Sequence, residues 1–224
     1  MTSWTGRGLW LACLLWTGSA RAADPPVVPG ARPPEEIPCR QDEALVRSFQ
    51  EVRTLRAAFT DRREVDLLDE PLVSRGRLHY QRPDRLHYAV ESPGRQEIVV
   101  AGSQVRVSQR DLGRSRSLDL QASDTARAVV SSLIQVLGGR LDRLEADYLC
   151  RSLRMADGWE VRLAPRGPPL DRAVRGIEAR IAGDGSLREV RVREATGDSS
   201  RMTLEDVQVN VPFSAEEEKA YFTP

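Results

Sequence analysis

The chain has 224 residues, of which 40% are hydrophobic and 5% aromatic, enough for one domain with short appendages. Its 33 lysines and arginines balance its 33 aspartates and glutamates. A neutral chain has no net field that would draw it to nucleic acid or anionic lipid, so we expect no nucleic-acid partner.

The N-terminus has the pattern of an export signal. Arg7 precedes an apolar run from Leu9 to Trp16, and Ala20-Arg21-Ala22 has the small-x-small form of a cleavage site. The run is too short to span a bilayer, and Cys13 lies inside it rather than after it, which disfavours lipidation. We predict a signal peptide over residues 1–22, cleaved near Ala22, and an exported mature chain.

A proline-rich segment follows the signal. Residues 24–38 hold six of the chain's 14 prolines, so we expect an extended tether over residues 23–39 and a folded domain over residues 40–224. After cleavage Cys39 and Cys150 are the remaining thiols, and an even pair in an oxidising compartment favours a disulfide. The alternative is two separate side chains, Cys150 packed in a strand and Cys39 exposed.

Apolar residues then recur at helical spacing. Leu45, Phe49, Val52 and Leu55 lie four and three residues apart among charged neighbours. Such a stripe predicts an amphipathic helix over about residues 42–56.

Period-two alternation, with turn residues between segments, predicts strands through most of the remaining chain. The eleven expected strands cover residues 57–65, 73–81, 85–91, 96–101, 104–109, 114–120, 147–155, 159–164, 174–181, 187–194 and 201–209. One helix interrupts them over residues 124–137, capped by Asp124 and ended by Gly138-Gly139. So many consecutive strands imply an antiparallel meander that curls toward a barrel, with the helices covering one face.

The stretch from Arg77 to Val90 contains the tetrapeptide RLHY twice, and it holds both histidines of the chain. A three-residue turn between the copies would place His79 opposite His87, with the leucines and tyrosines on the other face. We interpret the repeat as two arms of one hairpin, apolar within and basic on a solvated outer face. A metal held by the histidine pair is the alternative, but no third ligand is indicated, so we expect no metal.

Several short motifs occur in a fixed order along the chain. They are Phe59-Thr60, Ser74-x-Gly-x-Leu-x-Tyr, Arg82-Pro83, Ser92-Pro93, Ile98-Val99-Val100-x-Gly102, Trp159-x-Val-x-Leu-x-Pro165, Gly197-Asp198 and Phe222-Thr223-Pro224. Together with the order of helices and strands, this succession resembles the LolA family of periplasmic outer-membrane lipoprotein carrier proteins. The resemblance covers the chain from about Gln41 to its end.

The resemblance implies a mainly β (α+β) fold, an unclosed antiparallel barrel of about eleven strands with a helical lid over an apolar cavity. It implies a periplasmic carrier that shields the acyl chains of lipoproteins between an inner-membrane ABC transporter and an outer-membrane receptor. We therefore expect a monomer without cofactor or catalytic activity.

Within that scheme Arg82 takes the place of the family's arginine that ties the lid to the barrel through hydrogen bonds to helix backbone. A guanidinium suits this role because it offers several donors to carbonyl groups left unpaired at a helix end. The expected cavity lining is Leu78, Tyr80, Leu86, Ile98, Val100, Val130, Leu133, Ile134 and Leu137.

Other functions are also compatible with the sequence. The cargo could be another amphiphile such as a glycolipid, or the domain could be a non-enzymatic envelope sensor or adaptor. Gly197-Asp198-Ser199 resembles a fragment of a serine-hydrolase motif, but it has no strand-to-helix elbow and lies where a hairpin turn is expected.

Overall fold

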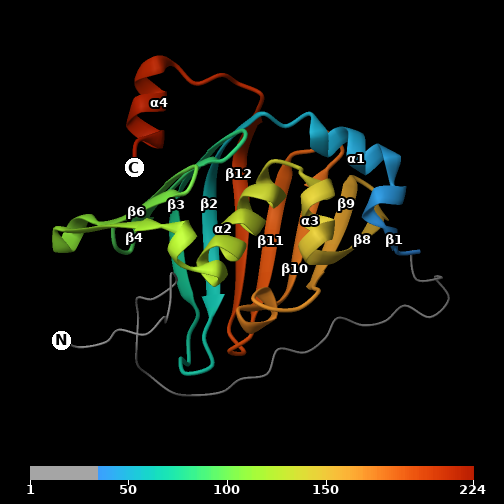
Figure 1. The fold of residues 1–224 in the computed structure, drawn as a ribbon, viewed down its shortest axis with the longest axis horizontal. Coiled ribbons are helices and arrows are strands. Elements are labelled where there is room, and N and C mark those ends of the chain that lie inside the picture. The colour runs from blue at the N-terminus through green and yellow to red at the C-terminus, as the bar shows by residue number, and fades with distance from the viewer. Residues whose placement is uncertain (1–34) are drawn as a thin grey trace.

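A computed structural model describes residues 35–224, which form a single antiparallel sheet with helices packed against it (Figure 1). The sheet has 12 strands in the order β1-β8-β9-β10-β11-β12-β2-β3-β4-β5-β6-β7. Sequential strands are neighbours except where β1 joins β8 and β12 joins β2, so the two halves of the chain meet side by side at the middle of the sheet.

The strands follow the alternation of the sequence, with buried and exposed residues in turn along most of them. Their bounds are Ile37–Pro38 (β1), Thr54–Glu64 (β2), Leu72–Gln81 (β3), Arg85–Ser92 (β4), Gln96–Ala101 (β5), Gln104–Gln109 (β6), Arg114–Asp119 (β7), Tyr148–Met155 (β8), Gly158–Pro165 (β9), Val174–Ala182 (β10), Leu187–Glu194 (β11) and Ser199–Val209 (β12).

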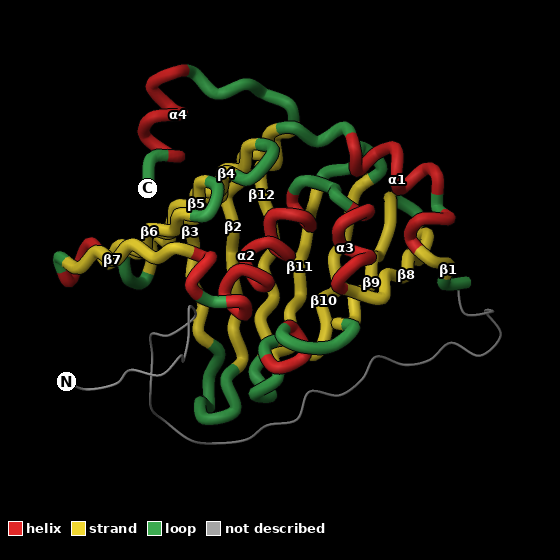
Figure 2. The backbone as a smooth tube through the Cα atoms, viewed as in Figure 1, coloured by secondary structure: helices red, strands yellow, loops and turns green. Residues whose placement is uncertain are grey.

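Three helices, α1 (Glu43–Gln50), α2 (Asp124–Leu137) and α3 (Leu141–Asp147), lie together on one face of the sheet (Figure 2). A fourth helix, α4 (Ala215–Phe222), follows the last strand and contacts β4 and β5. Among residues 35–224 no helix combines the length and apolarity needed to cross a membrane.

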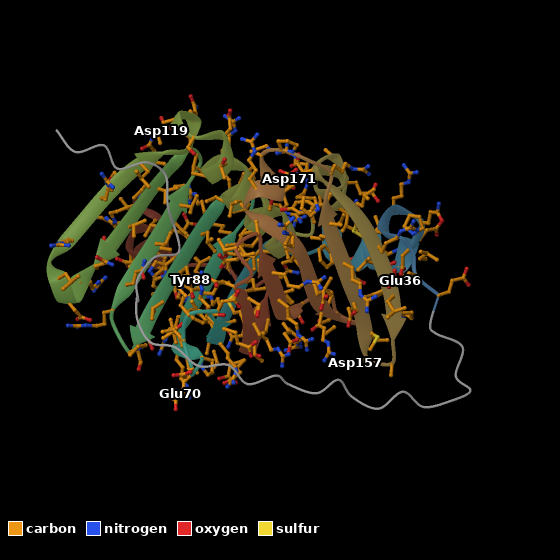
Figure 3. The ribbon with its side chains drawn as sticks, turned by 90° about the horizontal axis from the view of Figure 1, so that it is seen from below. Glu36, Glu70, Tyr88, Asp119, Asp157 and Asp171 are labelled. Atoms are coloured by element: carbon orange, nitrogen blue, oxygen red, sulfur yellow. A yellow bond between two sulfur atoms is a disulfide. The ribbon has the colours of Figure 1, made fainter. Side chains whose placement is uncertain are left out.

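The sheet is unclosed. Figure 3 marks its two ends with Glu36, beside β1, and Asp119, the last residue of β7. These edge strands each pair with one neighbour and not with each other. The predicted mainly β, unclosed antiparallel architecture is confirmed, with twelve strands in place of eleven.

The first helix is shorter than predicted. It ends at Gln50, and Leu55 belongs to β2, where it lies opposite Tyr80 and Val209. Leu55 fits both patterns, the helical stripe before it and the alternation with Ala57 after it, so the sequence alone is ambiguous here. Pairing with the neighbouring strands β3 and β12 places Leu55 in the sheet.

The second helix has the predicted bounds but a different cap. Ser123 is the N-cap residue and its hydroxyl accepts from the backbone N–H of Ala126 at 3.3 Å, whereas Asp124 lies in the first turn. A carboxylate in that turn still interacts favourably with the positive end of the helix dipole.

One strand, β1, and two α-helices, α3 and α4, were not predicted. Ile37 and Pro38 pair with β8 and Cys39 is buried, so the sheet begins inside the segment expected to be a tether. The predicted signal peptide and most of the tether lie outside the described residues.

Candidate functional site

The apolar interior lies between α2 and strands β3 to β5. Of the residues expected to line a cavity, Leu78, Tyr80, Leu86, Val100, Val130, Ile134 and Leu137 are buried, and Ile98 and Leu133 are partly buried against the same core. The structure therefore brings the whole predicted set together. In this structure side chains of α2 occupy the interior rather than leaving it open.

Arg82, in the turn between β3 and β4, reaches the end of α2. Its Nη2 donates to the carbonyl oxygen of Gly138 at 2.7 Å. Gly138 follows the last residue of α2, where helix carbonyls have no partner within the helix. The side chain thus connects the sheet to the C-terminal end of α2, at the helix backbone.

Glycine is required at that end of the helix because the sheet approaches closely. A Cβ on Gly138 would lie 2.1 Å from the Tyr80 hydroxyl oxygen, and one on Gly139, where φ is +63°, would lie 2.0 Å from the Phe49 carbonyl oxygen. Burial raises the pKa of Tyr80, with the Arg82 guanidinium acting in the opposite direction. The Gly-Gly pair therefore lets α2 end in contact with both β3 and α1.

A second polar contact joins α2 to the other half of the sheet. The hydroxyl of Tyr148 on β8 donates to Ser132 Oγ at 2.9 Å, and Ser132 Oγ donates to the carbonyl oxygen of Ala128 at 2.6 Å. Both Tyr148 and Ser132 are buried. This pair was not predicted, although the four-residue spacing of Ala128, Ser132 and Val136 places Ser132 on a buried row of the helix.

A disulfide joins Cys39 to Cys150 of β8, with the Cα atoms 5.5 Å apart. Nearby, Asp42 caps α1 by accepting from the backbone N–H of Leu45 at 3.0 Å. Ser152 Oγ donates to the other carboxylate oxygen of Asp42 at 3.3 Å. The start of α1 is thus attached to the sheet by a covalent and a polar contact.

The outer face of the RLHY hairpin is covered, not solvated as predicted. The predicted register is correct, with His79 opposite His87, Leu78 opposite Tyr88 and Tyr80 opposite Leu86. However, His79 and His87 are buried, and the ring of Tyr221 from α4 stacks on His79 with centroids 4.0 Å apart. This cover was not predicted, because α4 follows the last strand after an irregular segment and carries little apolar periodicity.

The two histidines form a hydrogen-bonded chain that ends on a carboxylate. Nδ1 of His79 lies 3.0 Å from Nδ1 of His87, and Nε2 of His87 lies 2.9 Å from Glu97 Oε1. If His87 donates from Nε2, its Nδ1 accepts the proton of His79, so both rings are satisfied while neutral. Among residues 35–224 no cluster of three or more His, Cys, Asp or Glu side chains is arranged to hold a metal.

Burial lowers the pKa of His79 from 6.5 to about 4, assisted by the neighbouring His87 and by the positive charge of Arg56. Burial alone would raise the pKa of Glu97, but hydrogen bonds from His87 and Arg110 outweigh it and hold that pKa below its ordinary value. The site under α4 therefore favours a neutral His79 ring and an ionised Glu97 carboxylate.

A family comparison agrees with this architecture. The sequence profile of the family described as "Outer membrane lipoprotein carrier protein LolA" matches residues 50–219, which include β2 to β12 and both faces described above. The chain belongs to the LolA family.

Two curated relatives carry the name outer-membrane lipoprotein carrier protein. The one from Halorhodospira halophila is 29% identical over 192 residues, which is 82% of this chain and 82% of the relative. The one from Chromohalobacter salexigens is 25% identical over 142 residues, 62% of this chain and 63% of the relative. Carriage of lipoproteins is thus the role of the LolA family to which this chain belongs.

Some solved structures also resemble this chain, at lower sequence identity. A LolA superfamily protein from Nitrosomonas europaea matches 84% of this chain and 98% of its own, with 9% identity and a TM-score of 0.43. The complex of MucA and MucB from Pseudomonas aeruginosa matches over 77% of this chain and 57% of that chain, with 14% identity and a TM-score of 0.45.

Proposed function

We propose that this LolA family member is a periplasmic carrier that shields the acyl chains of lipoproteins between α2 and the sheet. It would receive them from an inner-membrane ABC transporter and deliver them to an outer-membrane receptor, acting as a monomer without cofactor. The predicted signal peptide over residues 1–22 would export it. The observation that carries the proposal is the apolar interior whose outer wall is a separate helix, α2, linked to the sheet at Gly138 and Ser132.

The magnitude of acyl burial explains why such an interior needs a movable helix. Hiding about fifteen methylenes is worth on the order of 12 kcal/mol at roughly 0.8 kcal/mol each, so a permanently open pocket would release its cargo too slowly. Side chains of α2 that occupy the interior compete with the acyl chain for the same apolar surface. The closed state therefore lowers the apparent affinity in proportion to the fraction of molecules that are open.

The direct test is mass spectrometry of lipids and lipidated proteins that copurify with the protein. Leu133→Glu would place a carboxylate on the inner side of α2 and should leave the protein empty, because burying an unpaired charge against acyl chains is costly. Arg127→Glu is the matched control, since Arg127 lies on the same helix with its side chain 52% exposed. Lipidated proteins that copurify with the wild type and with Arg127→Glu, but not with Leu133→Glu, would support carriage.

Free glycolipid in place of lipidated protein would instead identify the alternative cargo. Wild-type protein without any acylated molecule would refute carriage and favour the sensor or adaptor alternative.

The role of Arg82 has its own test. Arg82→Leu removes the hydrogen bond to Gly138, and a hydrogen bond from a charged group contributes about 1.5–3 kcal/mol. The open state should gain population, so a dansyl-labelled fatty acid should bind about tenfold more tightly or better. Arg127→Leu removes the same charge from the exposed side of α2 and should leave the affinity unchanged. Equal affinities for both variants would show that Arg82 does not hold α2 closed.

A further inference from the structure

The face of the sheet opposite α2 carries a line of arginines that have no role in the carriage of acyl chains. The strand registers place these side chains directly opposite one another from β8 to β2, on the outward-pointing positions. In order, the opposed residues are Arg151, Arg162, Glu178, Arg191, Arg201 and Arg62. We call the five arginines of this set the arginine row.

The arginine row is unfavourable for the sheet itself. Like charges that lie directly opposite on neighbouring strands repel each other, and this happens between Arg151 and Arg162, between Arg191 and Arg201, and between Arg201 and Arg62. Carboxylates on the same strands relieve part of the repulsion, as where Glu189 pairs with Arg191 at 2.7 Å. Arg151 and Arg201 are exposed and have no carboxylate partner within the part of the chain that the structure describes.

A hollow lies at the β8 end of the arginine row. Its volume is about 240 Å³, and Leu149, Arg151, Arg162 and Arg193 are among the residues that line it, together with one carboxylate, Glu178, which pairs with Arg193 at 3.4 Å. Leu149 is 53% exposed, so the hollow offers apolar surface between guanidinium groups. Negative charge together with one apolar side chain would complement it.

One carboxylate from outside the strands already contacts the arginine row. Glu36, which precedes β1, forms a hydrogen-bonded ion pair with Nη1 of Arg162. A glutamate on an irregular segment can therefore reach the arginine row from the edge of the sheet.

We propose that the arginine row and its hollow bind an extended acidic segment of a partner protein. Six adjacent strands spaced about 4.8 Å apart span roughly 24 Å, which an extended chain of about seven residues covers at some 3.3 Å per residue. The arginine row lies on the outward-pointing positions of the sheet, and Glu36 pairs with Arg162 there, so a carboxylate on a chain segment outside the strands fits this surface. This docking surface does not depend on the carriage of acyl chains.

The test uses a fluorescein-labelled peptide of five Glu-Ala repeats, with a Gln-Ala peptide of the same length, in anisotropy titrations at low and high salt. The Glu-Ala peptide should bind, and binding should weaken at high salt. Arg151→Gln/Arg201→Gln should weaken it by roughly fivefold, from about 0.5 kcal/mol for each exposed charge pair. Arg47→Gln/Arg143→Gln removes the same charge from exposed positions on α1 and α3, and should change binding by less than about twofold.

Equal losses in the two double variants would mean that only net charge matters and would overturn the proposal, as would equal binding of the Gln-Ala peptide. Vesicles containing phosphatidylglycerol form the third arm of the experiment. If binding of the vesicles requires Arg151 and Arg201 while binding of the Glu-Ala peptide does not, the surface is a membrane site and the proposal is wrong. Thermal unfolding checks that each variant is folded, and removing repulsion in the arginine row should not lower its Tm.

Discussion

Lowering the pH should weaken the attachment of α4 to the sheet, through His79. His79 is buried between Tyr221 of α4 and His87 of β4, and the nearby positive charges of Arg56 and Arg77 oppose its protonation. Burial is the largest cause that lowers its pKa from 6.5 to about 4. The neutral ring is therefore the form that the folded protein prefers.

Proton linkage determines in which direction the free energy of unfolding changes with pH. Above pH 6.5 the ring is neutral in both folded and unfolded protein, so the full stability is present. As the pH falls below 6.5 the unfolded chain takes up a proton that the folded protein takes up only near pH 4, and stability is lost across that window. The full shift corresponds to about 3 kcal/mol. We expect about 1–2 kcal/mol, because α4 can loosen locally from the sheet and let water reach a charged ring.

The assay is urea unfolding of wild type and His79→Phe at several pH values between 7 and 4. Phenylalanine keeps the ring stacking on Tyr221 but cannot titrate, so its free energy of unfolding should fall less over the window, by about 1–2 kcal/mol. Glu97 is ionisable in both proteins, and because its pKa is lowered, its contribution to stability is lost at lower pH in each. Identical pH dependences would refute the reasoning.

Two further predictions concern the contacts around α2 and α1. Tyr148→Phe removes the hydrogen bond to Ser132, which is worth about 1 kcal/mol. Amide hydrogen exchange in α2 should therefore become roughly fivefold faster, while exchange in β10 changes little. An equal increase in both elements would show that Tyr148 does not stabilise α2 in particular. Cys39 and Cys150 are 111 residues apart, and reduction of their disulfide should lower the free energy of unfolding by about 2–5 kcal/mol. The double serine variant should have the same free energy of unfolding as the reduced protein, and a reductant should not change it. Free thiols at both positions in the denatured, unreduced mature chain would contradict the bridge.

Local patterns determined most of the fold. The alternation of apolar residues gave the strands from β2 to β12, and the turn after Gln81 fixed the pairing of His79 with His87. Both depend on the period of two along a strand, which needs no distant contact to be recognised. Helical spacing of apolar residues, with Asp124 and Gly138-Gly139 at the two ends, identified the bounds of α2 and its inward-facing residues Val130 and Ile134.

Contacts between distant segments decided the rest. Leu55 satisfied the helical and the strand pattern equally, and pairing with β3 and β12 placed it in the sheet. His79 is covered by Tyr221 of α4, which lies 142 positions later in the chain. No local sequence pattern predicts a contact between residues so far apart. The arginine row likewise exists only because the registers of six strands align residues that are isolated in the sequence. Sequence by itself therefore determined which residues form strands and which face each occupies, because that is set by neighbouring residues. Only the tertiary structure decided what covers each face and which charges meet on it, because those depend on strand order and packing.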